Sequence, residues 1–231
     1  TDPRNRPYSL DSLLPGPIHV RGAAYNARAM DHDQSFKNLI LDYPREALAF
    51  FAPSVAADLP PGVTFTPIRT EMLKARLGDR FREADTAVLA NFPDGSREAI
   101  LYDIEEHTTP ATFEIEQLAH YAIDLSLLMK TRRVVPVAVF LRSGRVETEL
   151  RLGLEQETFL SFRAVACRLS SLPAEQFLDS PNIVARLNLP NMAHPRGRRV
   201  DVYDNALEGL VRLEPNLNRR RKYLDFVDQY A

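Results

Sequence analysis

The chain has 231 residues, 45% of them hydrophobic, with 29 basic and 31 acidic side chains and a formal net charge of −2. This length fits one large domain or one domain with an extension, and the hydrophobic share is enough for a sizeable core. The near-neutral charge excludes a strongly basic nucleic-acid clamp, although it is compatible with a local basic patch.

The cysteine content and the apolar runs bound the environment of the protein. The single cysteine, Cys167, excludes an intrachain disulfide and a cysteine-based zinc site. A lone cysteine in an apolar stretch is typical of a reducing compartment, so we expect a cytoplasmic location. The sequence contains no run of about 18 apolar residues, so it predicts no membrane span. The polar, proline-rich segment 1–17 does not resemble a signal peptide.

The first part of the chain predicts an irregular arm followed by helices. Residues 1–30 have no sustained periodicity and contain several prolines and glycines. Helical spacing of apolar residues begins near Asp33, which is a suitable N-cap. Pro44 fits the first turn of a second helix, which carries Glu46. A proline-broken loop then leads to a short predicted strand over residues 64–69.

The middle of the chain predicts a β-hairpin, a long helix and further strands. Residues 84–92 and 98–107 are strand-like, and the PDGS sequence between them is typical of a turn. Residues 110–133 have apolar residues near helical spacing and basic residues at the C-terminal end. The nearly all-apolar run 134–141 predicts a strand covered on both faces. Residues 146–154 alternate, as a strand does.

After Leu172 the pattern becomes helical and polar, and it predicts helices over residues 182–192, 200–214 and 219–231. The predicted class is α/β, with a mixed central sheet of about four to five strands flanked by helices. The predicted organisation is an irregular N-terminal arm (1–30), an α/β core (31–170) and a helical C-terminal appendage (171–231).

The strand over residues 98–107 ends in an acidic cluster. Because side chains alternate along a strand, Asp103, Glu105 and His107 share one face, and the apolar residues between them share the other. A hairpin would bring Asp85, at the start of the preceding strand, across from residues 105–107. Clustered carboxylates repel each other unless a cation joins them, and Mg²⁺ prefers such oxygen ligands. The alternative interpretation is a solvated strand end with a charged rim.

The order of these residues resembles the PD-(D/E)xK nuclease pattern, in which an Asp and a Glu-x-Lys lie on adjacent strands. Asp85 is followed after the hairpin by Glu105-Glu106-His107. Gln117 and Tyr121 then form the Gln-x-x-x-Tyr that RecB-like members carry on the next helix. More narrowly, residues 32–40, the hairpin and LAHYAIDL resemble the recombination-promoting nuclease and putative transposase family. The resemblance covers about residues 30–170.

The resemblance implies a restriction-endonuclease-like fold and a metal-dependent DNA endonuclease that uses Mg²⁺ or Mn²⁺. It would make Asp85 and Glu105 metal ligands. It would place His107 at the position of the lysine that orients the attacking water. Gln117 and Tyr121 would support the site or the DNA backbone.

The chain departs from the family pattern because the motif lysine is absent. His107 takes its position if Glu105 is the motif carboxylate, whereas Thr108 takes it in the alternative register that begins at Glu106. Glu46 would be the additional acidic ligand that some members use. The missing lysine leaves a second function open, in which a catalytically degenerate nuclease fold acts as a binding or oligomerisation module.

Basic residues predict where a DNA partner would bind. Lys37 lies on the first predicted helix, and Arg196, Arg198 and Arg199 lie in the HPRGRR sequence. The basic run at 219–222 could also contact phosphates, with a solvated helix face as the alternative. A homodimer formed through the helical tail is a further expectation.

Overall fold

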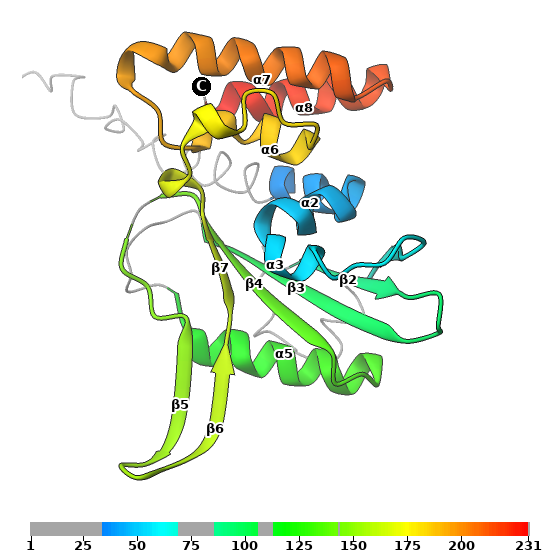
Figure 1. The fold of residues 1–231 in the computed structure, drawn as a ribbon, viewed down its shortest axis with the longest axis vertical. Coiled ribbons are helices and arrows are strands. Elements are labelled where there is room, and N and C mark those ends of the chain that lie inside the picture. Colours follow the sequence, from blue (N-terminus) through cyan, green and yellow to red (C-terminus); the bar gives the residue numbers. More distant parts are fainter. Residues whose placement is uncertain (1–33, 69–85, 106–112, 143, 231) are drawn as a thin grey trace, which may run out of the picture.

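The structure of the protein is a computed structural model that describes residues 34–68, 86–105, 113–142 and 144–230. A five-stranded sheet lies at its centre, in the order β1-β2-β3-β4-β7 (Figure 1). The strands are β1 (Thr64–Pro67), β2 (Thr86–Asn91), β3 (Arg97–Glu105), β4 (Val134–Phe140) and β7 (Val165–Arg168). The first three are antiparallel neighbours, and β4 and β7 join in parallel, so the sheet is mixed.

Helices cover both faces of this sheet. On one face lie α2 (Pro44–Phe51) and α3 (Pro53–Ala56), and on the other lies α5 (Ile115–Met129) (Figure 1). Ile100 and Tyr102 of β3 belong to the hydrophobic cluster on the α2 side, whereas Leu101 belongs to the cluster on the α5 side. The alternation predicted for β3 is therefore confirmed over the part whose side chains are described.

Short-range interactions explain several of the predicted elements. In the β2–β3 turn, the Asp94 carboxylate accepts hydrogen bonds from the Ser96 amide (2.9 Å) and hydroxyl (2.6 Å), and Gly95 has a positive φ of 83°. Pro44 occupies the first turn of α2, as its fixed φ favours. The sequence analysis used the same turn residues and the same proline to predict these elements. The predicted hairpin and second helix are confirmed.

The three helices predicted after residue 171 are confirmed, although the first is shorter than expected. They are α6 (Ile183–Leu187), α7 (Arg199–Leu213) and α8 (Leu217–Tyr230), with 3₁₀ turns η3 (Leu169–Ser171), η4 (Ala174–Gln176), η5 (Leu189–Asn191) and η6 (Arg196–Arg198). Figure 1 shows α6, α7 and α8 beyond α2, on the side of the sheet away from α5. Their buried residues share one hydrophobic cluster with α2 and the sheet, so the core continues across residue 171.

Side-chain caps position the beginnings of two of these helices. The Asn182 carboxamide oxygen accepts hydrogen bonds from the amides of Val184 and Ala185 at the start of α6, and its Nδ2 donates to the Glu46 carbonyl oxygen at 2.8 Å. The Asn216 carboxamide oxygen accepts in the same way from two amides in the first turn of α8. Asn182 therefore both begins α6 and connects it to α2.

A separate two-stranded ribbon extends from the sheet (Figure 1). It consists of β5 (Glu149–Leu154) and β6 (Glu157–Arg163), which pair antiparallel with an irregularity after Leu152. The sequence pattern predicted β5 but not β6 or β7. The far end of the ribbon exposes large apolar side chains, with Leu154 72% and Phe159 69% accessible.

The predicted α/β class, with a mixed sheet flanked by helices, is confirmed. The closer identity of the fold as restriction-endonuclease-like stays a prediction, and the N-terminal arm at residues 1–30 lies outside the described residues. In the part of the chain that the structure describes, no helix combines the length and the apolar character needed to cross a bilayer.

Candidate functional site

The α5-facing side of β3 carries a described acidic side chain. Asp103 is half-buried and pairs with Ala138 of β4 across the parallel ladder. Leu101, two positions earlier, is buried in the cluster under α5, so alternation places Asp103 on the same face. The sequence pattern had put Asp103 on this face without giving it a role in the site.

Gln117 and Tyr121 lie on α5, and the structure brings them together. The Gln117 Nε2 amide donates a hydrogen bond to the Tyr121 hydroxyl at 2.5 Å, as residues four apart on a helix can. Tyr121 is only 4% exposed and packs in the cluster that contains Leu101. The Gln-x-x-x-Tyr pair therefore lies on the same side of the sheet as Asp103, between the helix and the strands.

The predicted metal ligands lie at the border of the described residues. Glu105 is the last residue of β3 and pairs with Phe140, but its side chain is outside the described part. Asp85 and His107 are also outside it, as are Glu106 and Thr108 of the alternative register. Thr86, which follows Asp85 in the sequence, pairs with Tyr102. The choice between the Glu105 and Glu106 registers therefore stays a prediction.

Glu46 is placed in a different layer from the other candidates. It lies on α2, whose buried residues pack on the Tyr102 side of β3, whereas Gln117 and Tyr121 lie on the α5 side. Its carbonyl oxygen accepts the hydrogen bond from Asn182 that connects α2 to α6. The structure thus gives Glu46 a place in the helical layers and does not bring it together with the Gln117–Tyr121 pair.

Carboxylates are the ligands that a predicted Mg²⁺ site needs. Within residues 34–68, 86–105, 113–142 and 144–230, no three His, Cys, Asp or Glu side chains come together as a metal-binding group. Because Asp85 and His107 lie outside these ranges, the predicted site extends past the described part of the chain. Asp103 is the described carboxylate on the face where that site is expected.

The basic residues predicted to bind DNA occupy the C-terminal helical layer and the first helix. Arg196 and Arg199 line one cavity together with His194. Arg198, between them, forms an ion pair with Asp201 at 2.7 Å. Lys37 is half-buried on the helix formed by residues 34–42. The preceding residue, Phe36, packs its ring against Tyr230, which lines the same cavity, with 5.8 Å between centroids.

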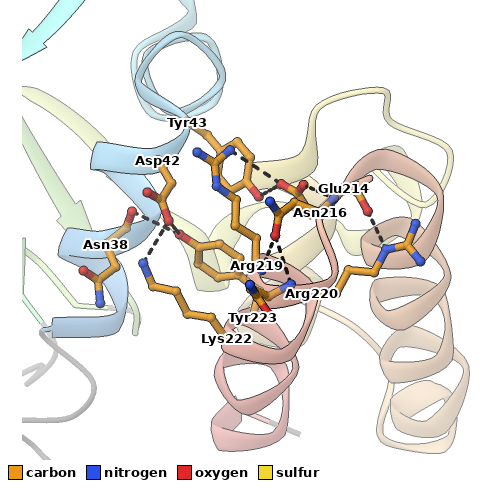
Figure 2. Close-up of polar contacts among 10 residues, drawn as sticks. Asn38, Asp42, Tyr43, Glu214, Asn216, Arg219, Arg220, Lys222 and Tyr223 are labelled. Carbon is orange, nitrogen blue, oxygen red and sulfur yellow. Dashed lines mark hydrogen bonds and ion pairs between the residues drawn. The ribbon is translucent and has the colours of Figure 1, made fainter.

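Three residues of the basic run at 219–222, Arg219, Arg220 and Lys222, contact other parts of the protein (Figure 2). Lys222 forms an ion pair with Asp42 at 2.8 Å, and the Arg220 guanidinium donates to the Glu214 carbonyl oxygen. Arg219 lies 3.9 Å from the Glu214 carboxylate. These contacts hold α8 against the helix at residues 34–42 and against the α7–α8 turn, and local sequence patterns contained no signal for them.

Two tyrosines complete this network, which Figure 2 shows between the first helix and α8. Burial, followed by the hydrogen bond to Glu214, raises the pKa of Tyr43, and burial together with Asp42 raises the pKa of Tyr223. Burial alone would raise the pKa of Asp42, but the bonds from Lys222 and Tyr223 outweigh it and hold that pKa below its ordinary value. The phenols therefore stay protonated donors, and Asp42 stays an anionic acceptor.

Comparison of the chain with models of protein families, with curated proteins and with solved structures found no match in any of the three. A functional assignment therefore rests on the residues and the geometry of this chain.

Proposed function

We propose that the protein is a metal-dependent DNA endonuclease of the PD-(D/E)xK type, related to recombination-promoting and transposase-like proteins. The observation that supports this best is the hydrogen-bonded Gln117–Tyr121 pair on α5, which lies on the same side of the sheet as Asp103 of β3. Glu105 ends β3, the antiparallel neighbour β2 begins one position after Asp85 in the sequence, and Gln117 and Tyr121 lie on the helix that follows, which supports the motif order that the resemblance implies.

In this proposal Asp85 and Glu105 hold Mg²⁺ or Mn²⁺. Their carboxylate oxygens are hard ligands that suit either ion, and the half-buried Asp103 adds a further carboxylate on β3. A divalent ion bound there would supply a hydroxide nucleophile and stabilise charge on the scissile phosphate. His107 would orient water or the phosphate, and Gln117 would position that phosphate through its contact with Tyr121.

The DNA backbone would be bound by cationic side chains, which neutralise phosphates without reading sequence. The candidates are Lys37, Arg196, Arg198 and Arg199. Arg198 is the weakest of them because Asp201 already compensates its charge. A cytoplasmic location belongs to the same proposal, and the burial of the free thiol of Cys167 is consistent with it.

Nicking of supercoiled plasmid DNA tests the proposal. The purified protein would be incubated with Mg²⁺, Mn²⁺ or EDTA, beside Asp85→Asn, Glu105→Gln and Glu106→Gln. We expect metal-dependent nicking that falls at least roughly 100-fold in Asp85→Asn and in one of the two glutamate variants, which identifies the register. Glu155→Gln, at the exposed end of the ribbon, is the matched control. Absence of nicking with either metal, or full activity in Asp85→Asn, would contradict the proposal.

A second candidate function is a binding or oligomerisation module on a catalytically degenerate nuclease fold. The exposed apolar end of the β5–β6 ribbon favours it, because Leu154 and Phe159 lie largely in solvent. An isolated two-stranded ribbon is marginally stable in water, and a second copy of the chain would cover its apolar face. Sedimentation equilibrium should then show a dimer that Phe159→Ser weakens and Ile123→Ser, an exposed apolar change on α5, does not. A wild-type monomer would exclude this homodimer.

A further inference from the structure

A cavity of about 430 Å³ is lined by residues of the C-terminal helical layer. Figure 1 shows the helices of this layer on the side of the sheet away from α5. Its lining comes from separate segments: Pro190 in η5, His194 in the next loop, Arg196 in η6, Arg199 at the start of α7 and Tyr230 at the end of α8. Cavities that bind small molecules commonly measure about 300–1,000 Å³. This one is therefore large enough for a small ligand or for the end of a larger one.

The lining is cationic. It contains two guanidinium groups and an imidazole, and none of its five residues is a carboxylate. In the described part of the chain, no hydrogen bond or ion pair joins Arg196 to another residue, whereas Arg198 beside it is compensated by Asp201. Asp201 thus neutralises the arginine that does not line the cavity. Arginine binds phosphate through parallel hydrogen bonds from its planar group, so these side chains suit an anion.

The imidazole of His194 is held by a backbone contact. Its Nδ1 atom lies 2.8 Å from the Met192 carbonyl oxygen. Because a carbonyl oxygen can only accept, Nδ1 carries a proton and donates, and Nε2 is the nitrogen that a ligand can reach.

The cavity also lies at the N-terminus of a long helix. Arg199 is the first residue of α7, which runs for 15 residues, and the preceding Arg198 side chain makes no capping hydrogen bond. The first amides of a helix lack intrahelical partners, and the helix dipole adds positive potential there. Such an end favours a phosphate group, and here it adds to the arginines and the imidazole.

We propose that this cavity binds a phosphate monoester, such as the phosphate of a free nucleotide or the phosphorylated end of a nucleic-acid strand. A phosphate monoester carries about −1.5 to −2 charge at pH 7, whereas a diester within a strand carries one negative charge. Two guanidinium groups and a helix N-terminus match the larger charge. The inference does not rest on the catalytic residues proposed for the nuclease, although Arg196 and Arg199 are also the candidates named above for contacts to DNA phosphates.

Isothermal titration calorimetry in EDTA tests the inference without any divalent ion that a nuclease would use. The probes are inorganic phosphate, adenosine 5′-monophosphate, dimethyl phosphate, and a short single-stranded oligonucleotide with either a 5′-phosphate or a 5′-hydroxyl. Arg196→Gln removes an exposed lining charge, and Arg212→Gln removes an exposed charge in the last turn of α7, away from the cavity. Both positions are at the surface, so both variants should fold.

We expect inorganic phosphate and adenosine 5′-monophosphate to bind, and dimethyl phosphate to bind far more weakly. Arg196→Gln should weaken binding roughly tenfold or more, and Arg212→Gln by less than about twofold. If the protein prefers the 5′-phosphorylated oligonucleotide to the 5′-hydroxyl form, the bound phosphate belongs to a strand end. If it binds the mononucleotide but neither oligonucleotide, the bound phosphate belongs to a free nucleotide. Both results support the site. No binding of any phosphate, equal binding of dimethyl phosphate, or equal losses in the two arginine variants would overturn it.

Discussion

The phenol of Tyr43 donates a hydrogen bond to the carboxylate of Glu214, 171 residues later in the chain. Glu214 is only 2% exposed, and its other carboxylate oxygen accepts from the Asn216 amide at 2.7 Å. The Tyr43 ring also packs against the Tyr223 ring, with 5.4 Å between centroids. This contact joins the end of the first helix to the α7–α8 turn (Figure 2).

Replacing Tyr43 by Phe should destabilise the protein by about 2 kcal/mol. The change leaves a buried carboxylate without one of its donors, and hydrogen bonds to charged groups contribute about 1.5–3 kcal/mol. Urea unfolding measures the effect. Tyr203→Phe is the matched control, because it removes a phenol–carboxylate bond of 2.5 Å to Asp228 at an exposed position. That loss should be much smaller because solvent screens the exposed pair, and equal losses in both variants would contradict the role assigned to burial.

Asp42 should make the stability of the protein depend on acidic pH. Its pKa in the folded protein is lowered, so its contribution is fully present above the ordinary aspartate pKa of about 4 and disappears as pH falls through the folded value. Asp42→Asn should therefore cost about 1 kcal/mol at pH 7, and this difference from wild type should shrink towards pH 2. Urea unfolding across this range measures it, with Asp225→Asn on the exposed face of α8 as the control. A difference that stays constant with pH would count against the prediction.

Gly209→Ala should destabilise the protein although alanine is the better helix former. A Cβ at Gly209 would lie 2.6 Å from Nε and 2.8 Å from Cβ of Arg186, which is buried in the α6–α7 contact. Overpacking costs about 1–3 kcal/mol, which exceeds the gain of up to about 1 kcal/mol from helix propensity. Thermal unfolding should show a lower midpoint. Gly197→Ala, with no atom within 4 Å of the added Cβ, should change little; a stabilised Gly209→Ala would show that the helices can separate without cost.

Tyr102→Phe should leave stability unchanged or raise it by up to about 1 kcal/mol. The Tyr102 side chain is fully buried on the α2 side of β3, and its hydroxyl has no hydrogen-bond partner among the described residues. Removing this group therefore removes a desolvation cost. Tyr223→Phe makes the same chemical change where the hydroxyl lies 2.6 Å from the Asp42 carboxylate, and it should lower stability. Denaturant midpoints of the two variants should move in opposite directions, and a marked loss in Tyr102→Phe would reveal a partner for its hydroxyl.

The proposed nuclease predicts that Gln117→Ala lowers plasmid nicking by at least roughly tenfold while the unfolding midpoint changes little. The amide acts through its contact with Tyr121, so Tyr121→Phe should also lower nicking. His120→Ala, on the exposed face of the same helix, should keep wild-type activity. If Gln117→Ala lowers the unfolding midpoint and leaves nicking intact, the pair has a structural role alone.

Elements with strong local signals were predicted well from the sequence. The β2–β3 hairpin follows from the Asp94–Gly95 turn, and α2 begins where Pro44 favours a first turn. β6 and β7 were missed for a different reason. β7 is four residues long and is defined by its pairing with β4, while β6 pairs with β5 outside the main sheet and is exposed along most of its length.

The candidate site was predictable only in part. Helical spacing identified the Gln117–Tyr121 pair, and strand alternation put Asp103 on the face that α5 covers. The position of α2 opposite α5 separates Glu46 from that pair, and periodicity contains no information about which face a helix will cover. The side chains of Asp85, Glu105 and His107 lie outside the described part of the chain, so their grouping stays a prediction.

Patterns of neighbouring residues were sufficient for the α/β class, most of the elements and the order of the motif residues, because turns, caps and periodicity act over a few positions. The Tyr43–Glu214 contact and the cavity lined by His194, Arg196 and Arg199 depended instead on how α8 packs against the first helix and α7. Each joins residues from different segments, and side chains distant in sequence meet only after the hydrophobic core has set the positions of the helices that carry them.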